Sequence, residues 1–426
     1  MNTTDEKLFS STGELDPNFG ADGAYEVSPP SDYQVISPQA LVLGPAGDSY
    51  YACSTIAVNG VMGYAYFHLT EGGTLDTTFG KEGYVFGDFG TSRFFPRQIF
   101  LVDIQATRKI LVVGDFRASG SPSKKALFRM ELNGTADATF GNNGLVIVES
   151  PATRCASTTA TDRQPNNDQA QASVMSDGKI LLLQNLDSPF GVITVLNSDG
   201  SPDKTFNKTG HFTAQPENAL QTFLESVMRL PDGKYLAVGW VIVQPSDAPQ
   251  ALFIQLDGTG QLDTSFNKTG YLSVGEKNEY FAIHQLALQP NQRVLAIGEA
   301  SASIRKGLLI SREPNGEANI QFNRAQPLKT VLDYAETGWL AGTVQSDGKL
   351  LVAGRADLPM EATQNVVIAR FISDGTLDTS FGKGTGSLRF PQTTGSSLAI
   401  AFMPDKVLFF SWTTDTNIKI MRGLLG

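Results

Sequence analysis

Cysteine, histidine and tryptophan are scarce in this chain of 426 residues, which has two, three and three of them. Two thiols in so long a chain cannot form a disulfide framework. We therefore expect Cys53 and Cys155 to be free, with a single bridge between them left open. The histidines His68, His211 and His284 lack the spacing typical of metal ligands, which argues against a metal centre built from several histidines.

Positively charged residues are fewer than negatively charged ones, and long apolar runs are absent. The 33 Lys and Arg residues are outnumbered by 43 Asp and Glu residues, which gives a net charge of −10. Nucleic acids and anionic membranes bind basic surfaces, so we expect neither as a partner. No run approaches the roughly 18 apolar residues of a membrane helix, so no membrane insertion is expected. Residues 1–16 lack the apolar core of a Sec signal. We expect a monomer, either cytoplasmic or exported without a Sec signal peptide.

Turn-forming residues, in contrast, are abundant, with 42 glycines and 21 prolines. This composition favours many short strands joined by turns over long helices. The chain also exceeds the length of about 250–300 residues at which a single hydrophobic core stops growing. Several domains or a repeat array are therefore expected.

One motif, with the consensus LDxxFG, returns along the whole chain. It is clearest as LDTTFG at 75–80 and as LDTSFG at 377–382. A fixed internal period of this kind indicates a repeat architecture. Its phenylalanines follow one another at intervals of 60, 61, 66, 60, 56 and 59 residues: Phe19, Phe79, Phe140, Phe206, Phe266, Phe322 and Phe381. Its aspartate occurs in six copies, as Asp16, Asp76, Asp137, Asp203, Asp263 and Asp378.

A second signature lies between the LDxxFG copies and is typified by QSDGKLLVAG, which ends at Gly354. It consists of an apolar strand, a tight turn and another apolar strand. Asp-Gly suits the turn because it tolerates the positive φ angles of a two-residue hairpin. A third strand precedes each LDxxFG motif and a short fourth strand follows it. Apolar residues alternate with a period near two, and no segment has a convincing helical period.

Seven units of four antiparallel strands predict an all-β, seven-bladed β-propeller that forms one domain over residues 1–426. A β-solenoid is the alternative, but its coils are usually shorter and lack two hairpins per unit. The C-terminus supplies three strands without an LDxxFG motif, whereas the N-terminus begins with that motif and one strand. We therefore expect residues 23–28 to pair with residues 417–421 and close the last blade. The expected blades 1–6 span about 38–90, 97–150, 170–215, 225–275, 284–331 and 340–391, and blade 7 combines 1–30 with 397–426.

The combined pattern DGxLDxxFGxxG and QxDGKxLVxG resembles the delta-60 repeat, a bacterial family of largely unassigned function. The resemblance covers essentially the whole chain and is weakest in the first and sixth copies, where Asn319 replaces the motif aspartate. The rhythm is also similar to that of NHL-type propellers. That similarity implies that the strand before the Asp-Gly turn is the innermost of its blade.

The recurring aspartate has a structural and a functional interpretation. The carboxylate can accept backbone N–H groups of its own turn as an Asx-type lock, while the phenylalanine inserts between neighbouring blades. Alternatively, Asn197, Asp199 and Asp203 have the alternating oxygen ligands of a calcium loop, although the bidentate acid that ends such loops is absent. A feature that is repeated around the ring favours the structural interpretation. We therefore expect no cofactor and keep calcium as the alternative.

Ligand-binding residues are sought where the copies differ, in the loops that join consecutive blades and the second to the third strand of each blade. In a propeller these connections open on one face around the central channel. Residues 149–169 form the longest departure and should be an exposed loop. Aromatic and charged side chains in such loops can bind ligands by stacking and hydrogen bonding, although they can equally be core residues between blades. The candidate binding residues are Arg97, Arg163, Tyr280, His284 and Trp339.

Two functions remain compatible with these features. The first is a non-catalytic binding or scaffolding propeller that recognises a protein, glycan or small ligand on the loop face. The second is a propeller-type hydrolase or lactonase with acidic residues at the channel mouth, possibly metal-dependent. The regular repeat, the few histidines and the absence of a GxSxG nucleophile motif favour the first. We therefore expect no catalytic residues, although the fold itself supports both functions.

Overall fold

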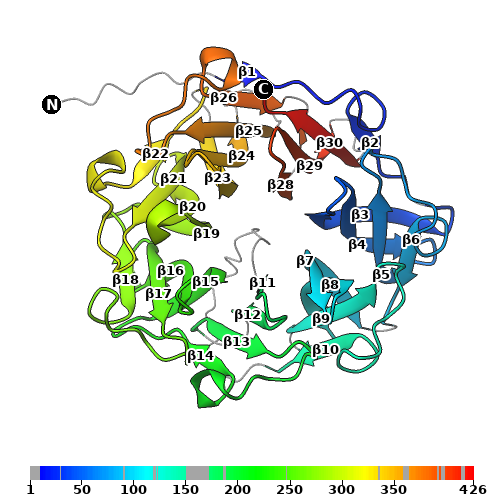
Figure 1. Cartoon of the computed structure of the whole chain (residues 1–426), viewed down its shortest axis with the longest axis horizontal. Coiled ribbons are helices and arrows are strands. Elements are labelled where there is room, and N and C mark those ends of the chain that lie inside the picture. Colours follow the sequence, from blue (N-terminus) through cyan, green and yellow to red (C-terminus); the bar gives the residue numbers. More distant parts are fainter. Residues whose placement is uncertain are drawn as a thin grey trace.

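The computed structural model describes residues 10–28, 30–89, 92–118, 121, 123–149, 172–185, 189–245, 247–333, 336–357, 364–390, 393–394, 399–413 and 418–426. The strands form seven sheets around a central axis, which makes the fold the predicted all-β, seven-bladed β-propeller (Figure 1). Within the described residues the only helical turns are the 3₁₀ segments at 206–208, 290–292, 323–325 and 382–384. This part of the chain has no helix long and apolar enough to cross a membrane.

Consecutive strands of a blade pair antiparallel, and the first strand lies nearest the axis (Figure 1). Blades 1–3 comprise β3 (Tyr33–Leu43), β4 (Ser49–Ala57), β5 (Met62–Leu69), β6 (Tyr84–Gly87); β7 (Arg93–Ile104), β8 (Thr107–Arg117), β9 (Lys124–Glu131), β10 (Leu145–Val148); β11 (Ala172–Val174), β12 (Ile180–Gln184), β13 (Val192–Leu196) and β14 (His211–Thr213). Blades 4–6 comprise β15 (Gln221–Arg229), β16 (Tyr235–Ile242), β17 (Gln250–Leu256), β18 (Tyr271–Val274); β19 (Tyr280–Leu288), β20 (Val294–Ser301), β21 (Arg305–Arg312), β22 (Leu328–Thr330); β23 (Glu336–Val344), β24 (Leu350–Asp357), β25 (Gln364–Phe371) and β26 (Ser387–Phe390).

Blade 7 is built from both ends of the chain. It contains β28 (Ile400–Phe402), β29 (Lys406–Thr413), β30 (Ile418–Leu424) and the N-terminal β2 (Ala24–Glu26). Ala24 pairs with Met421 and Glu26 with Lys419, which confirms the predicted closure. A short strand, β27 (Thr393–Thr394), pairs with the C-terminal end of β29, and β28 pairs with the N-terminal part of β29.

A second N-terminal strand was not predicted. β1 (Ser11–Thr12) runs parallel to β26 and adds a fifth strand to the outer edge of blade 6. The N–H of Gly13 then donates to the carbonyl of Arg389 at 2.8 Å. The N-terminal segment therefore supplies the outermost strand of two neighbouring blades.

The hydrophobic core is divided among the blade junctions. Each of the seven buried clusters joins residues of two adjacent blades and contains one LDxxFG phenylalanine. Phe19, for example, packs with Tyr51 of blade 1 and Phe410 of blade 7. Because every cluster is formed by two adjacent blades, each blade stabilises its neighbours and the ring is stabilised as a unit.

The motif aspartate forms an Asx turn in its own connection. The Asp137 Oδ1 accepts the backbone N–H of Thr139 at 3.0 Å, and Asp263 does the same with Ser265. The Oδ2 of Asp137 accepts from Arg129 and Lys109, which come from the third and second strands of the blade. In the region considered for calcium, the Asp203 Oδ2 likewise lies 2.7 Å from the Lys179 Nζ.

Among the described residues, five inner strands carry a β-bulge at an equivalent position. The bulged residues are Gln39, Arg97, Glu225, His284 and Leu340. The bulge brings the inner strand against the glycine that ends the second-strand signature. A Cβ on Gly298 would lie 1.9 Å from the Ala282 carbonyl oxygen, and one on Gly354 would lie 1.8 Å from that of Gly338. Close backbone approach therefore explains these glycines.

Candidate functional site: a pocket at the loop end of blade 1

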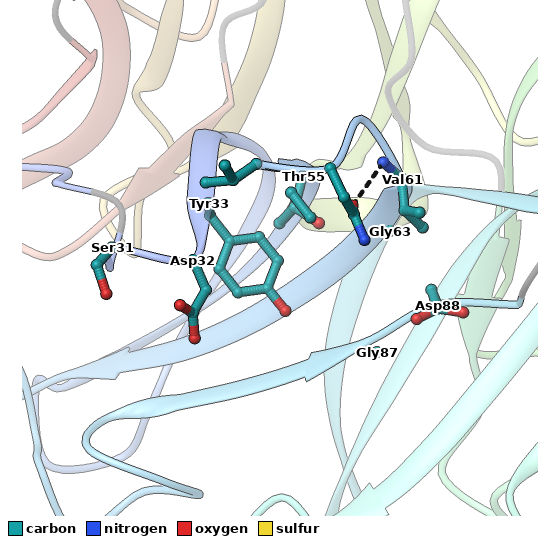
Figure 2. Close-up of a pocket in the computed structure, with 11 residues that line it drawn as sticks. Ser31, Asp32, Tyr33, Thr55, Val61, Gly63, Gly87 and Asp88 are labelled. Carbon is teal, nitrogen blue, oxygen red and sulfur yellow. Dashed lines mark hydrogen bonds between the residues drawn. The ribbon is translucent and has the colours of Figure 1, made fainter.

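A pocket of about 540 Å³ opens on blade 1, on the face that carries the loops between blades (Figure 2). Its walls come from residues 31–33 at the start of β3, residues 55–63 around the β4–β5 connection and residues 87–88 at the end of β6. The β4–β5 loop is held by a hydrogen bond of 3.1 Å from the Val61 N–H to the Asn59 Oδ1. This volume is in the range of about 300–1,000 Å³ that is usual for small-ligand sites.

An aromatic wall and two carboxylates give the pocket its chemical character. The Tyr33 ring stacks on Phe86, with centroids 4.0 Å apart and planes 13° apart. Figure 2 shows Asp32 and Asp88 on the two sides of Tyr33. Burial raises the pKa of the Tyr33 hydroxyl, and the negative charges of Asp32 and Asp88 raise it further. No lysine, arginine or histidine is among the described residues that line this pocket.

Thr55 forms a wall between the pocket and a second hollow. Thr55 is 3% exposed, and its hydroxyl has no hydrogen-bond partner among the described residues. The second hollow, of about 270 Å³, lies between blades 1 and 2 and is lined by Thr55, Gly63, Gln39 and Arg93. A buried hydroxyl without a partner is costly, so this wall can gain stability from a ligand or water that hydrogen-bonds to it.

The rim of the pocket is apolar. Val58, Val61 and Met62 follow one another around the β4–β5 connection and are 57%, 36% and 36% exposed. Val58 and Val61 line the pocket, and Met62 lines the neighbouring hollow. The site thus combines two exposed carboxylates with apolar surface beside them.

Two of the sequence-derived candidates, Arg97 and His284, occupy equivalent bulge positions in blades 2 and 5. The Arg97 Nε donates to the Asp115 Oδ2 at 2.9 Å, and the Lys125 Nζ lies 2.5 Å from the Asp115 Oδ1. Burial would raise the pKa of Asp115, but the charges of Lys125 and Arg97 outweigh burial and lower it. Arg97 is therefore held in an ion-pair cluster of its own blade.

His284 is 2% exposed, and neither ring nitrogen has a hydrogen-bond partner among the described residues. Burial lowers the pKa of its imidazole; the charge of Glu299 opposes this effect, and those of Arg355 and Arg305 reinforce it. These groups extend to Asp357 and Glu336, both of which interact with the Arg305 Nη2. The histidine thus faces a polar network between blades 5 and 6.

The remaining candidates are distributed differently. Trp339 is 0% exposed and packs against Phe371 in the core between blades 5 and 6, so its ring presents no surface to a ligand. Tyr280 is half-buried at the start of β19. Arg163, Cys155 and most of the loop at 149–169 lie outside the described residues. Cys53 is a free and fully buried thiol, and burial raises its pKa.

The pocket residues were missed in the sequence, although a signal was present. An acid followed by tyrosine drew attention to the loops at Glu279–Tyr280 and Asp333–Tyr334. The same pair occurs as Asp32–Tyr33. Its place near the N-terminus, before the first complete blade, kept this pair from being singled out.

Comparison with known proteins agrees with this architecture. Residues 105–140, 230–266 and 345–381 match the family model described as "Domain of unknown function (DUF5122) beta-propeller". The chain is built from β-propeller repeats. No curated protein sequence matches it.

Similar solved structures include the β-propeller domain of the Trilobed protease from Pyrococcus furiosus, with 10% identity, a TM-score of 0.45 and coverage of 92% of this chain and 94% of that one. A protein of unknown function from Dyadobacter fermentans has 9% identity and a TM-score of 0.45, with coverage of 96% and 100%. An α-L-arabinofuranosidase from Fusarium graminearum has 12% identity and a TM-score of 0.41, with coverage of 86% and 98%.

Proposed function

We propose that this protein is a non-catalytic binding propeller that holds a ligand on its loop face, in the pocket at the loop end of blade 1. The observation that carries the proposal is the pocket itself, which combines a ligand-sized volume, a stacked aromatic wall and a buried hydroxyl without a described partner. A small ligand, a glycan or a side chain of a partner protein would fit this description. We also propose, from the period and the two signatures, that its repeats are of the delta-60 type.

Methionine methyl NMR can test the binding function. Met62 follows the pocket residue Val61 and lines the neighbouring hollow that shares Thr55 with the pocket, whereas Met130 is fully buried in the core between blades 1 and 2. The protein is labelled at its methionine methyl groups, and the Met62 signal is assigned with a Met62→Leu variant. We expect at least one member of a panel of cationic, anionic and neutral small molecules, short peptides and oligosaccharides to shift the Met62 signal while Met130 stays in place.

The same panel separates binding from catalysis. A binding protein should return each ligand chemically unchanged after prolonged incubation, with and without added divalent metal. Hydrolysis of a lactone or ester in the panel, lost on substitution of the pocket acids, would favour the enzyme alternative. A panel that leaves the Met62 signal unmoved would overturn the assignment of the site.

A further inference from the structure

We infer that the pocket of blade 1, together with the hollow beside it, binds a neutral carbohydrate of two linked sugar rings. This inference rests on the proposed binding function and adds the chemistry of the ligand. It starts from the two volumes, of about 540 Å³ and about 270 Å³, which have Thr55 and Gly63 in common among their lining residues. The two volumes therefore adjoin, and a ligand of two units suits them.

Neutral hydrogen-bonding groups predominate over charges in the two linings. The described side chains with an aliphatic hydroxyl or an amide are Ser31, Thr55 and Asn59 in the pocket, and Ser37, Gln39, Ser54 and again Thr55 in the hollow. The charged side chains are Asp32, Asp88 and Arg93, and all three residues are exposed. Water and salt screen exposed charges, so these charges contribute little to the choice of ligand. Hydroxyl and amide groups both donate and accept hydrogen bonds, as the hydroxyl groups of a sugar do.

Tyr33 provides an aromatic surface for the apolar face of a sugar ring. Its ring stacks on Phe86, with centroids 4.0 Å apart, which fixes its orientation. Figure 2 shows the ring in the pocket, next to Asp32. The C–H groups of a pyranose ring can pack on such an aromatic surface, and its outward hydroxyl groups can then donate to the Asp32 carboxylate. Val58 and Val61 add exposed apolar surface to the same pocket.

Thr55 gives the site a buried polar group that lacks a partner. The residue is 3% exposed, and its hydroxyl has no hydrogen-bond partner among the described residues. A Cβ on Gly63 would lie 3.1 Å from the Thr55 Oγ1, so the lack of a side chain at Gly63 leaves this side of the hydroxyl uncovered. A buried hydroxyl without a partner is destabilising, which favours a hydroxylated ligand over an apolar ligand of the same size.

The test follows the Met62 methyl signal during titration with four neutral disaccharides: cellobiose, maltose, lactose and chitobiose. We expect at least one of them to shift the signal saturably, with an affinity that added salt does not change because the ligand is uncharged. Methyl β-glucopyranoside, which has one ring, should bind more weakly than that disaccharide. Cyclohexanol, a ring of similar size with a single hydroxyl, should give no saturable shift. Glucosamine and glucuronate are the matched charged probes.

Two substitutions locate the sugar. Tyr33→Leu removes the aromatic surface and should weaken disaccharide binding about tenfold, which corresponds to about 1.4 kcal/mol. Thr55→Val removes the hydroxyl and keeps the shape of the side chain, so binding should weaken about fivefold while the melting temperature does not fall. Thr222→Val is the matched control, because the Thr222 hydroxyl donates to the Ala214 carbonyl at 2.7 Å and accepts the Gly191 N–H at 3.0 Å. It should lower the melting temperature and leave sugar binding unchanged.

The failures of the two proposals are distinguishable. A Met62 shift with a peptide or a charged small molecule, but with none of the four disaccharides, would overturn the carbohydrate and leave the binding function standing. Tighter binding of glucosamine or glucuronate than of methyl β-glucopyranoside would also overturn it, because charge would then determine recognition. No Met62 shift with any ligand of either panel would overturn both proposals.

Two further outcomes bear on the placement of the sugar. Unchanged disaccharide affinity in Tyr33→Leu or in Thr55→Val would overturn the assignment of the sugar to this pocket. Methyl β-glucopyranoside that binds as tightly as every disaccharide would overturn the two-ring ligand.

Discussion

Asp16 and Arg422 are hydrogen-bonded through Oδ2 and Nε at 2.9 Å, although 406 positions separate them in the chain. Both residues are almost completely buried. The Arg422 guanidinium also lies 4.7 Å from the centroid of the Phe19 ring and donates to the Glu71 carbonyl. One ion pair therefore connects the N-terminal motif, the last strand of the chain and blade 1.

Removing this arginine should open the ring. Arg422→Met leaves the Asp16 carboxylate buried, and among the described residues its remaining cationic partner is Lys406, at 3.1 Å. Breaking a buried pair costs about 3–5 kcal/mol, so we expect the free energy of unfolding to fall by about 3 kcal/mol in urea denaturation. Glu14→Gln, which removes the exposed pair with Lys383, should change it by less than about 1 kcal/mol. Equal effects of the two substitutions would contradict the role assigned to the buried pair.

The N-terminal strands should be required for a closed ring. Deleting residues 1–30 removes β1 and β2 and leaves the backbone groups of β30 unpaired along one edge. Exposed strand edges pair with other chains, so we expect aggregation or a large loss of thermal stability. Deleting residues 2–9 retains both strands and is the control. A 1–30 deletion that stays monomeric in light scattering and melts with the intact protein would show that the clasp is dispensable.

Acid should unfold the propeller by protonating the motif aspartates. Burial would raise the pKa of Asp16, but the hydrogen bond from the Asn18 N–H and the interactions with Lys406 and Arg422 lower it to about 2. A lowered folded-state pKa stabilises the fold above the unfolded-state value of about 4, and this contribution is lost as the pH falls towards 2. Asp16→Asn should therefore lose less unfolding free energy than the wild type between pH 4 and pH 2. Parallel pH profiles for the two proteins would show that Asp16 does not contribute.

His284 should make the protein less stable under mildly acidic conditions. Burial lowers the pKa of His284 in the folded state, so the unfolded chain takes up the proton first as the pH falls below about 6.5. Between pH 7 and pH 5, the His284→Gln variant should lose less unfolding free energy than the wild type, by about 1 kcal/mol or more. His211→Gln, at a partly exposed position in β14, is the control. An unchanged slope in the His284 variant would mean that the network with Glu299 accepts the protonated ring.

The glycines beside the bulges should not tolerate a methyl group. Gly298→Ala would place its Cβ 1.9 Å from the Ala282 carbonyl oxygen, and the strands must separate to accept it. Overpacking of this kind costs about 1–3 kcal/mol, and we expect the upper end because the obstacle is backbone. Gly258→Ala meets nothing closer than 3.5 Å and should leave the melting temperature nearly unchanged. Similar melting temperatures for the two variants would indicate that the bulge adapts.

The repeat, the strand content and the closure of the ring could be predicted from the sequence because each depends on local patterns. The Asp-Gly turns are an example in part. The Gly178 and Gly348 φ angles are positive, at +81° and +83°, as predicted, whereas Asp177 and Asp347 do not have positive φ angles and the loop is not the predicted two-residue hairpin. The missing fourth strand of the last blade was likewise visible in the C-terminal residues. Such features need only nearby residues and the two-residue period of a strand.

The pocket, the bulges and the ion pair between Asp16 and Arg422 depend on the tertiary structure. Asp32 and Asp88 lie in different turns, and only the four-stranded register of blade 1 brings both to the same pocket as Thr55. The environment of His284 depends on Arg355, which reaches it from the next blade. In a sequence these residues are separated by many positions without a repeating pattern, so their contacts follow from how neighbouring blades pack rather than from any local preference.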